Sequence, residues 1–211
     1  EFRFYLTLMA TTTTLVCLGL YFTGTYADWS ESFLQGLFHT VSIATTTGFS
    51  IASFYDWPIF LGILLIFSSF VGGCAGSTGG GIKVIRFLLL IKQGLREIDR
   101  LIHPNAQIPV RVGGRTVEHR VVDAVWGFFS LYVACFTLMY LALAATGLDL
   151  TTAFTAVAAA INNLGPGLGE VGASFATISP TAKWILCFAM LLGRLEVFTL
   201  LVLLTPAFWR P

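Results

Sequence analysis

The stretch Ala44-Thr45-Thr46-Thr47-Gly48-Phe49-Ser50 ends a short apolar run with four hydroxyl residues, one glycine and one aromatic residue. A second stretch, Asn162-Asn163-Leu164-Gly165-Pro166-Gly167, follows another short apolar run. Each run is shorter than the roughly 20 apolar residues that cross a bilayer, and each is too apolar for an ordinary loop. Irregular backbone at membrane depth is tolerated only where it is buried in protein or lines a wet cavity. We therefore predict two re-entrant pore loops whose backbone carbonyls face an ion.

The composition is that of a membrane protein. Of the 211 residues, 56% are hydrophobic and 11% are charged, and the mean hydropathy is +0.82. Soluble domains carry roughly 25% charged residues. We therefore predict an all-α integral membrane protein that crosses the lipid bilayer several times. The net charge of +1 gives no indication of a nucleic-acid partner, and the four cysteines form no CxxC pair that would predict a disulfide framework.

Apolar runs and their breakers predict two repeats with one plan: a span, a short pore helix, a filter and a second span. The first repeat, residues 1–92, has its span at 4–22, pore helix at 32–44, filter at 45–50 and a broken span at 58–92. A loop follows at 93–120. The second repeat, residues 121–211, has its span at 121–147, pore helix at 151–161, filter at 162–167 and last span at 181–209.

Charge orients these spans. Residues 83–120 hold eight of the twelve Lys and Arg residues, so the positive-inside rule places this segment and both ends of the chain on the cytoplasmic side. The opposite loops carry Asp28, Glu31, Asp56, Asp149 and Glu170. Acidic groups around a wet mouth raise the local cation concentration, although any one of them is equally consistent with a solvated interface carboxylate. The loop 93–120 is either solvated or a docking site for a cytosolic protein.

A glycine-rich segment interrupts the predicted span at 58–92. Its six glycines in ten residues are Gly72, Gly73, Gly76, Gly79, Gly80 and Gly81. Each glycine costs a helix interior about 1 kcal/mol relative to alanine, so the helix should melt here. We predict a flexible constriction or gate; a close helix-packing face is the alternative.

Arg194 belongs to the same prediction. It follows Thr181 by about 20 Å of helix at 1.5 Å per residue, which places it near mid-membrane. A membrane-buried arginine is a functional candidate by default. We predict that Arg194 holds the segment Gly72–Gly81 by its carbonyls and sets a positive barrier in the ion path. The alternative is a salt bridge that only joins helices.

Together these motifs resemble the TrkH family, the membrane subunits of bacterial Trk potassium uptake systems in the Trk/Ktr/HKT superfamily. The resemblance covers essentially the whole chain and rests on residues 45–50, 72–83, 161–167, 193–196 and 205–210. Members of the family have four repeats around one pore, and these two resemble the third and fourth. The resemblance implies potassium translocation across the bacterial inner membrane, with potassium as the bound ion and no organic cofactor on this chain.

The resemblance also implies site residues and partners. Backbone carbonyls in the two filters would bind potassium, and they belong to Thr46, Thr47, Gly48, Asn163, Leu164 and Gly165. The filter flanks are Thr45, Phe49, Asn162 and Pro166, and the gate consists of the six glycines above with Arg194. The implied partners are the remaining pore repeats or a second chain, a homodimer partner, and a TrkA-like cytosolic nucleotide-binding regulatory subunit.

Two other functions stay open on the sequence. An ion-coupled secondary transporter would use carboxylates at the membrane midplane, and the spans hold one, Glu196. An intramembrane hydrolase would use Ser174 as its nucleophile, but no histidine lies in a long span to activate it. We expect channel-like translocation without covalent chemistry, and therefore no enzyme.

Overall fold

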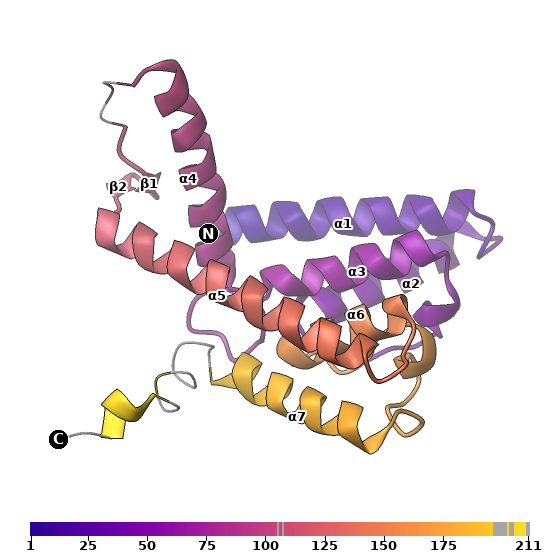
Figure 1. Cartoon of the computed structure of the whole chain (residues 1–211). Helices are drawn as coiled ribbons and strands as arrows, with labels where there is room; N and C mark the ends of the chain where they lie inside the picture. The colour runs from indigo at the N-terminus through magenta and orange to yellow at the C-terminus, as the bar shows by residue number, and fades with distance from the viewer. Residues whose placement is uncertain (105, 107, 196–201, 203–204, 210–211) are drawn as a thin grey trace.

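The computed structural model describes the chain except residues 105, 107, 196–201, 203–204 and 210–211. The described part is mostly helical (Figure 1). Its longer elements are α1 (Phe2–Phe22), α2 (Trp29–Ala44), α3 (Ile59–Val71), α4 (Val84–Ile102), α5 (His119–Ala144), α6 (Leu150–Ile161) and α7 (Pro180–Arg194). Shorter elements are the strands β1 (Arg111–Val112) and β2 (Arg115–Thr116), and the 3₁₀ turns at Phe54–Asp56, Gly169–Val171 and Pro206–Trp209.

The helices pack in two groups of three. Helices α1, α2 and α3 contact one another, as do α5, α6 and α7, and α3 touches α6 between the two groups. Helix α4 leaves the bundle at a steep angle and contacts α5 (Figure 1). The predicted pore helix of each group, α2 or α6, therefore lies against the two other helices of its group.

Each group of helices has its own apolar core. One core gathers α5, α6 and α7 around Leu143, Val157 and Leu192. The other gathers α1, α2 and α3 around Leu20 and Leu65, and it also includes Ala158, Ala159, Leu164 and Leu168 from the second half of the chain. Helix α6 is buried along most of its length, because its run of alanines lets neighbouring helices approach closely.

An aspartate caps each of the two predicted pore helices, α2 and α6. Asp28 accepts a hydrogen bond from the backbone N–H of Ser30 at 3.4 Å, and Asp149 accepts one from that of Thr152 at 3.0 Å. The side-chain oxygen satisfies a backbone donor that has no partner within the helix. Because Asp28 is the cap, α2 begins at Trp29, three residues before the predicted start of the pore helix at residue 32.

Residues 72–83 are not helical and separate α3 from α4. The predicted loop at 93–120 is wrong in its first part, because α4 continues to Ile102. Leu89 of α4 packs against Val110, Val122 and Val125, so this helix is stabilised by the loop and by α5. The remaining loop contains the β1–β2 hairpin, in which Arg111 pairs with Thr116.

The last predicted span, 181–209, begins as expected but is not described throughout. Helix α7 runs from Pro180 to Arg194. Residues 206–209 form a 3₁₀ turn instead of the predicted α-helix, and Pro206 opens this turn without a backbone N–H to donate. Glu196, the predicted midplane carboxylate, lies outside the described residues.

Among the described helices, α1 and α5 are long and apolar enough to cross a membrane. Helices α3 and α6 are apolar but shorter.

Candidate functional site

The two segments predicted as filters have matching backbones. Both adopt left-handed backbone at the same two places, Thr46 and Gly48 (φ 56° and 80°) and Asn163 and Gly165 (φ 52° and 108°). In both, an amide just after the short helix donates back into that helix at 2.8 Å, from Thr47 to the Ser42 carbonyl and from Leu164 to the Ala159 carbonyl. Corresponding residues are 117 positions apart in every case. Two chemically different stretches thus share one conformation.

The two segments touch at Gly48. A Cβ atom at this position would lie 2.1 Å from the carbonyl oxygen of Leu164, far inside any van der Waals contact. The positive φ of 80° is also one that side-chain-bearing residues rarely adopt. Only glycine therefore fits where the backbones of the two halves meet.

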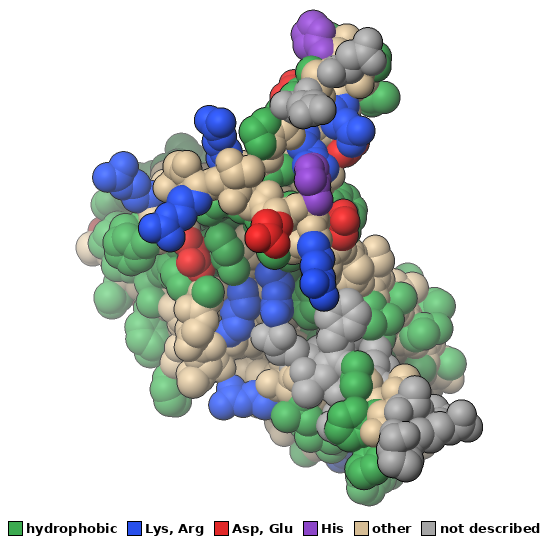
Figure 2. Space-filling model, turned by 90° about the vertical axis from the view of Figure 1, so that its left-hand side faces the viewer, with side chains coloured by type: hydrophobic (Ala, Val, Ile, Leu, Met, Phe, Trp, Pro, Cys, Tyr) green, Lys and Arg blue, Asp and Glu red, His purple; other side chains and the backbone are tan. Residues whose placement is uncertain are grey.

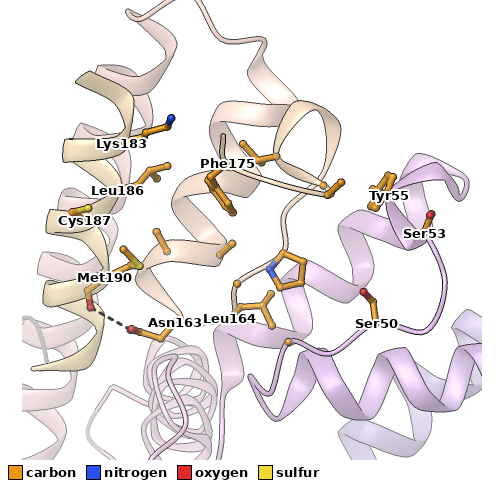
Figure 3. Close-up of a pocket in the computed structure, with 18 of the residues that line it drawn as sticks. Ser50, Ser53, Tyr55, Asn163, Leu164, Phe175, Lys183, Leu186, Cys187 and Met190 are labelled. Carbon is orange, nitrogen blue, oxygen red and sulfur yellow. Dashed lines mark hydrogen bonds between the residues drawn. The ribbon is translucent and has the colours of Figure 1, made fainter. Parts of the chain in front are cut away.

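A large cavity lies beside the second segment (Figure 3). Its volume is about 1050 Å³, and Gly48, Asn163, Leu164, Gly165 and Pro166 contribute to its wall. Figure 3 shows Asn163 and Leu164 between α7, which carries Lys183, Leu186, Cys187 and Met190, and the segment of Ser50, Ser53 and Tyr55. Four of the predicted site residues of the second segment therefore line this cavity together with Gly48.

Other predicted site residues lie elsewhere. Thr45, Thr47 and Phe49 line a separate, mainly apolar hollow of about 380 Å³ against α2. Asn162 is fully buried and lines neither hollow. Thr46 faces the glycine-rich segment through its hydroxyl, which accepts a hydrogen bond from the Gly80 N–H at 3.0 Å.

The side chains at the two left-handed non-glycine positions brace the segments. The Thr46 hydroxyl bonds to Gly80, and the Asn163 amide donates to the Met190 carbonyl at 3.3 Å (Figure 3). Both side chains therefore help to hold the backbone. Ser42, which we did not select from the sequence, holds the first segment by donating its hydroxyl to the Phe49 carbonyl at 2.6 Å.

The glycine-rich segment folds beneath both filter segments. Gly80 bonds to Thr46 of the first, and a Cβ at Gly80 would lie only 1.7 Å from the Asn162 carbonyl oxygen of the second. The chain then turns back, since the Ile82 N–H donates to the Phe70 carbonyl at 2.8 Å and the Val84 N–H donates to the Gly73 carbonyl at 3.1 Å. The break in the helix thus brings backbone directly under the filter segments.

Two cations hold this segment by its carbonyls. Arg194 donates to the Thr78 carbonyl at 2.7 Å, which is the kind of contact predicted for it. Lys83, which we did not select from the sequence, donates to the carbonyls of Ser77, at 2.7 Å, and Gly79. Three successive carbonyls therefore bond to charged side chains, next to a cavity of about 250 Å³ that Lys83, Arg86 and Arg194 help to line.

A buried polar network, also missed in the sequence, lies behind the second segment. The Tyr132 hydroxyl donates to the Asn162 side-chain oxygen at 2.7 Å, and the Asn162 amide donates to the Ser69 hydroxyl at 2.9 Å. The sequence offers one indication of this network, a tyrosine with a polar hydroxyl in the middle of a long apolar span. Its partners come from α3 and from the end of α6, and no sequence pattern pairs them.

His39 of α2 and Ser174, the serine considered above as a nucleophile, both have hydrogen-bond partners within the protein. Both ring nitrogens of His39 lie within hydrogen-bond distance of backbone carbonyls, Gln35 at 2.8 Å and Ala52 at 3.2 Å. The hydroxyl of Ser174 accepts from the Ala176 N–H at 3.1 Å. Across the described residues no group of three or more His, Cys, Asp or Glu side chains is placed to hold a metal.

Comparison with known proteins identifies the family. Residues 4–210 match the family described as TrkH, cation transport protein. The chain belongs to the TrkH family. It is 60% identical over 185 residues to a Trk system potassium uptake protein TrkH of Vibrio parahaemolyticus, covering 88% of this chain and 38% of the relative. It is 52% identical over 210 residues to the protein of that name from Escherichia coli K12, covering 100% of this chain and 44% of the relative.

The fold agrees with a solved TrkH structure. The crystal structure of the potassium transporter TrkH from Vibrio parahaemolyticus superposes with a TM-score of 0.93 at 55% identity, covering 100% of this chain and 45% of that one. The resemblance drawn from the motifs is therefore confirmed. The chain spans less than half the length of the TrkH relatives it matches.

Proposed function

We propose that this chain contributes two of the pore repeats through which potassium crosses the bacterial inner membrane. The observation that carries the proposal is the matched backbone of residues 45–50 and 162–167, with left-handed residues at equivalent places. TrkH membership supports the choice of ion, because the relatives are named as potassium uptake proteins. The repeats are residues 1–92 and 121–211, each a span, pore helix, filter and span.

In this proposal the backbone carbonyls at Thr46, Thr47, Gly48, Asn163, Leu164 and Gly165 bind potassium. Carbonyl oxygens replace the hydration shell of the ion, as in other potassium filters. The Thr46 hydroxyl oxygen already accepts a hydrogen bond from the Gly80 N–H, which supports the backbone carbonyl as the ligand at this position. Two repeats do not surround an ion, so the remaining pore repeats complete the site.

The segment 72–83 acts as the gate. It lies under both filter segments, and Arg194 holds it from α7 through the Thr78 carbonyl. A charge-assisted hydrogen bond is stronger than a neutral one and stabilises the closed position. Arg194 and Lys83 also place positive charge below the filter, which opposes the passage of a cation while the segment is closed.

The end of the molecule with α4 and the hairpin faces the cytoplasm. Figure 2 shows Lys and Arg side chains gathered on this side with fewer Asp and Glu, the charge pattern of a cytoplasmic face. Both ends of the chain and residues 93–120 lie on this side. We place here the docking site for a TrkA-like nucleotide-binding regulatory subunit, and we propose that the assembled protein is a homodimer.

The test is ion uptake into liposomes. We would measure rubidium uptake against excess sodium for this chain alone, and for a chimera in which residues 4–210 replace the matching part of the Vibrio parahaemolyticus relative. We expect selective uptake from the chimera and none from the chain alone, because half of the pore is missing. Absence of uptake in the chimera, with the unmodified relative active in parallel, would overturn the proposal.

The same assay distinguishes channel-like translocation from secondary transport. Channel-like translocation follows the potassium gradient alone, whereas a coupled transporter requires a proton or sodium gradient in addition. Uptake that needs such a gradient would favour the coupled alternative.

A further inference from the structure

We propose that Tyr132 is a positioning residue for potassium selectivity, which anchors the second filter through the side chain of Asn162. The inference rests on the proposed function, because it concerns the same filter. Tyr132 lies on α5 and does not belong to either filter segment. Its hydroxyl bonds to Asn162, which caps the C-terminal end of α6 and begins the second filter segment.

The geometry is that of a complete buried network. The Tyr132 hydroxyl donates to Asn162 Oδ1 at 2.7 Å, Asn162 Nδ2 donates to Ser69 Oγ at 2.9 Å, and Ser69 Oγ donates to the Ile66 carbonyl at 2.6 Å. Tyr132 is 4% exposed, and Asn162 and Ser69 are fully buried. Buried polar groups are costly unless paired, so each member depends on the others.

The two partners determine the orientation of the Asn162 amide. A carboxamide presents an acceptor on one side and donors on the other, and here Tyr132 occupies the first and Ser69 the second. The side chain is thereby held between α5 and α3. Asn163 follows directly in the left-handed conformation with φ 52°, so the orientation of Asn162 bears on the first proposed ligand of this filter.

The need for such an anchor comes from the gate. The Asn162 carbonyl packs against Gly80, where even a Cβ atom would lie 1.7 Å from the oxygen. When segment 72–83 moves, the filter loses this backbone support. Tyr132 belongs to α5, which does not carry that segment, so its bond keeps Asn162 in place while the gate opens.

The anchor is specific to the second filter. Thr45 holds the equivalent position in the first, and its hydroxyl lies within hydrogen-bond distance of the Val41 and Ser42 carbonyls and of the Thr47 hydroxyl. All of these partners belong to its own helix and filter. At this position the first filter is therefore braced locally, whereas the second is braced by α5 and α3.

The experiment compares Tyr132→Phe with Tyr140→Phe in the chimera. Tyr140 lies on the same helix, outside both filter segments, and its ring contacts Phe154. We expect Tyr132→Phe to lower the ratio of rubidium to sodium uptake about tenfold, because a buried acceptor is left without its donor. Tyr140→Phe should keep the parent ratio.

A second variant distinguishes a loss of selectivity from a general loss of stability. Ser69→Ala removes the other partner of Asn162 and should lower the same ratio, and the double variant should show less than the product of the two effects, since both act through one amide. A melting temperature that falls while the uptake ratio stays at the parent value, in either single variant, would reduce the network to a structural role and overturn the inference. Failure of the parent itself to take up rubidium selectively would instead overturn the proposed function, and this inference with it.

Discussion

At the scale of single residues, Gly48 is the sharpest test of the contact between the two filters. We expect Gly48→Ser to abolish selective uptake, because its Cβ would collide with the Leu164 carbonyl at 2.1 Å. Left-handed backbone alone costs a side-chain-bearing residue about 1–2 kcal/mol, and the collision adds to this. Rubidium uptake against sodium in the chimera measures the effect.

Gly24→Ser is the matched control for this change. Gly24 also has a positive φ, of 68°, but nothing lies within 4 Å of the position of its Cβ. Its substitution imposes the backbone strain without the collision and should leave selectivity unchanged. Equal losses of selective uptake in the two variants would mean that the contact between the two filter backbones does not determine ion selectivity.

Arg194 tests the gate at the same scale. We expect Arg194→Ala to raise potassium flux about ten- to a hundredfold, because a hydrogen bond to a charged group, worth about 1.5–3 kcal/mol, no longer holds the Thr78 carbonyl. Flux from single liposomes gives the measurement, and Arg100→Ala, which removes an exposed pair with Glu97, serves as the control. Unchanged flux with a lower melting temperature would favour a role in joining helices.

At the scale of elements, the start of helix α6 depends on Asp149. Hydrogen bonds from the Thr152 side chain and backbone hold the pKa of the Asp149 carboxyl below its ordinary value. Because the native pKa lies below the unfolded one, the carboxylate contributes stability at neutral pH, and this contribution is lost as the pH falls through the native pKa, below about 4. We expect Asp149→Ala to cost about 1 kcal/mol at pH 7, the typical value of a lost cap.

Asp149→Asn separates the cap from its charge. Asparagine caps helices about as well as aspartate but does not titrate in acid, so this variant should match the parent at pH 7 and lose less stability at pH 3. Thermal unfolding in detergent at both values provides the comparison. An identical loss on acidification in parent and variant would show that this carboxylate does not carry the pH dependence.

At the scale of the whole molecule, α4 presents an apolar stripe away from the bundle. Ile91, Leu95, Ile98 and Ile102 recur at helical spacing, and Leu95 and Ile98 are 57% and 56% exposed. Contiguous apolar patches of this kind mark interaction sites. In the proposed homodimer we expect the stripe to contribute to the contact between copies.

Serine at both Leu95 and Ile98 tests this contact. Burial of one such side chain contributes roughly 1.5–3 kcal/mol, so the double variant should weaken dimerisation by more than about tenfold while the fold keeps its melting temperature. Cross-linking in detergent over a dilution series measures the dimer, with Asp99→Ser as an exposed control on the same helix. A dimer of unchanged affinity would place the interface elsewhere.

Much of the fold follows from local patterns in the chain. The glycines of residues 72–81 end α3, and the aspartates at 28 and 149 begin α2 and α6, because these effects depend on neighbouring residues alone. The charged residues after residue 92 predict a loop, whereas α4 continues to Ile102, because its apolar residues keep a helical spacing.

The candidate site divides in the same way. Glycines, small polar residues and breaks in apolar runs are signals that can be read locally. They mark Thr46, Gly48, Asn163 and Gly165, and all four residues adopt the left-handed backbone. Other contacts of the site depend on how separate segments pack. They are the hydrogen bonds of Asn162 with Tyr132 and Ser69, and those of Lys83 with the Ser77 and Gly79 carbonyls. A hydrogen bond between residues that are distant in the chain cannot be predicted from the sequence pattern around either residue. Such contacts exist only once the helices have buried their apolar faces against each other and brought the polar groups within reach.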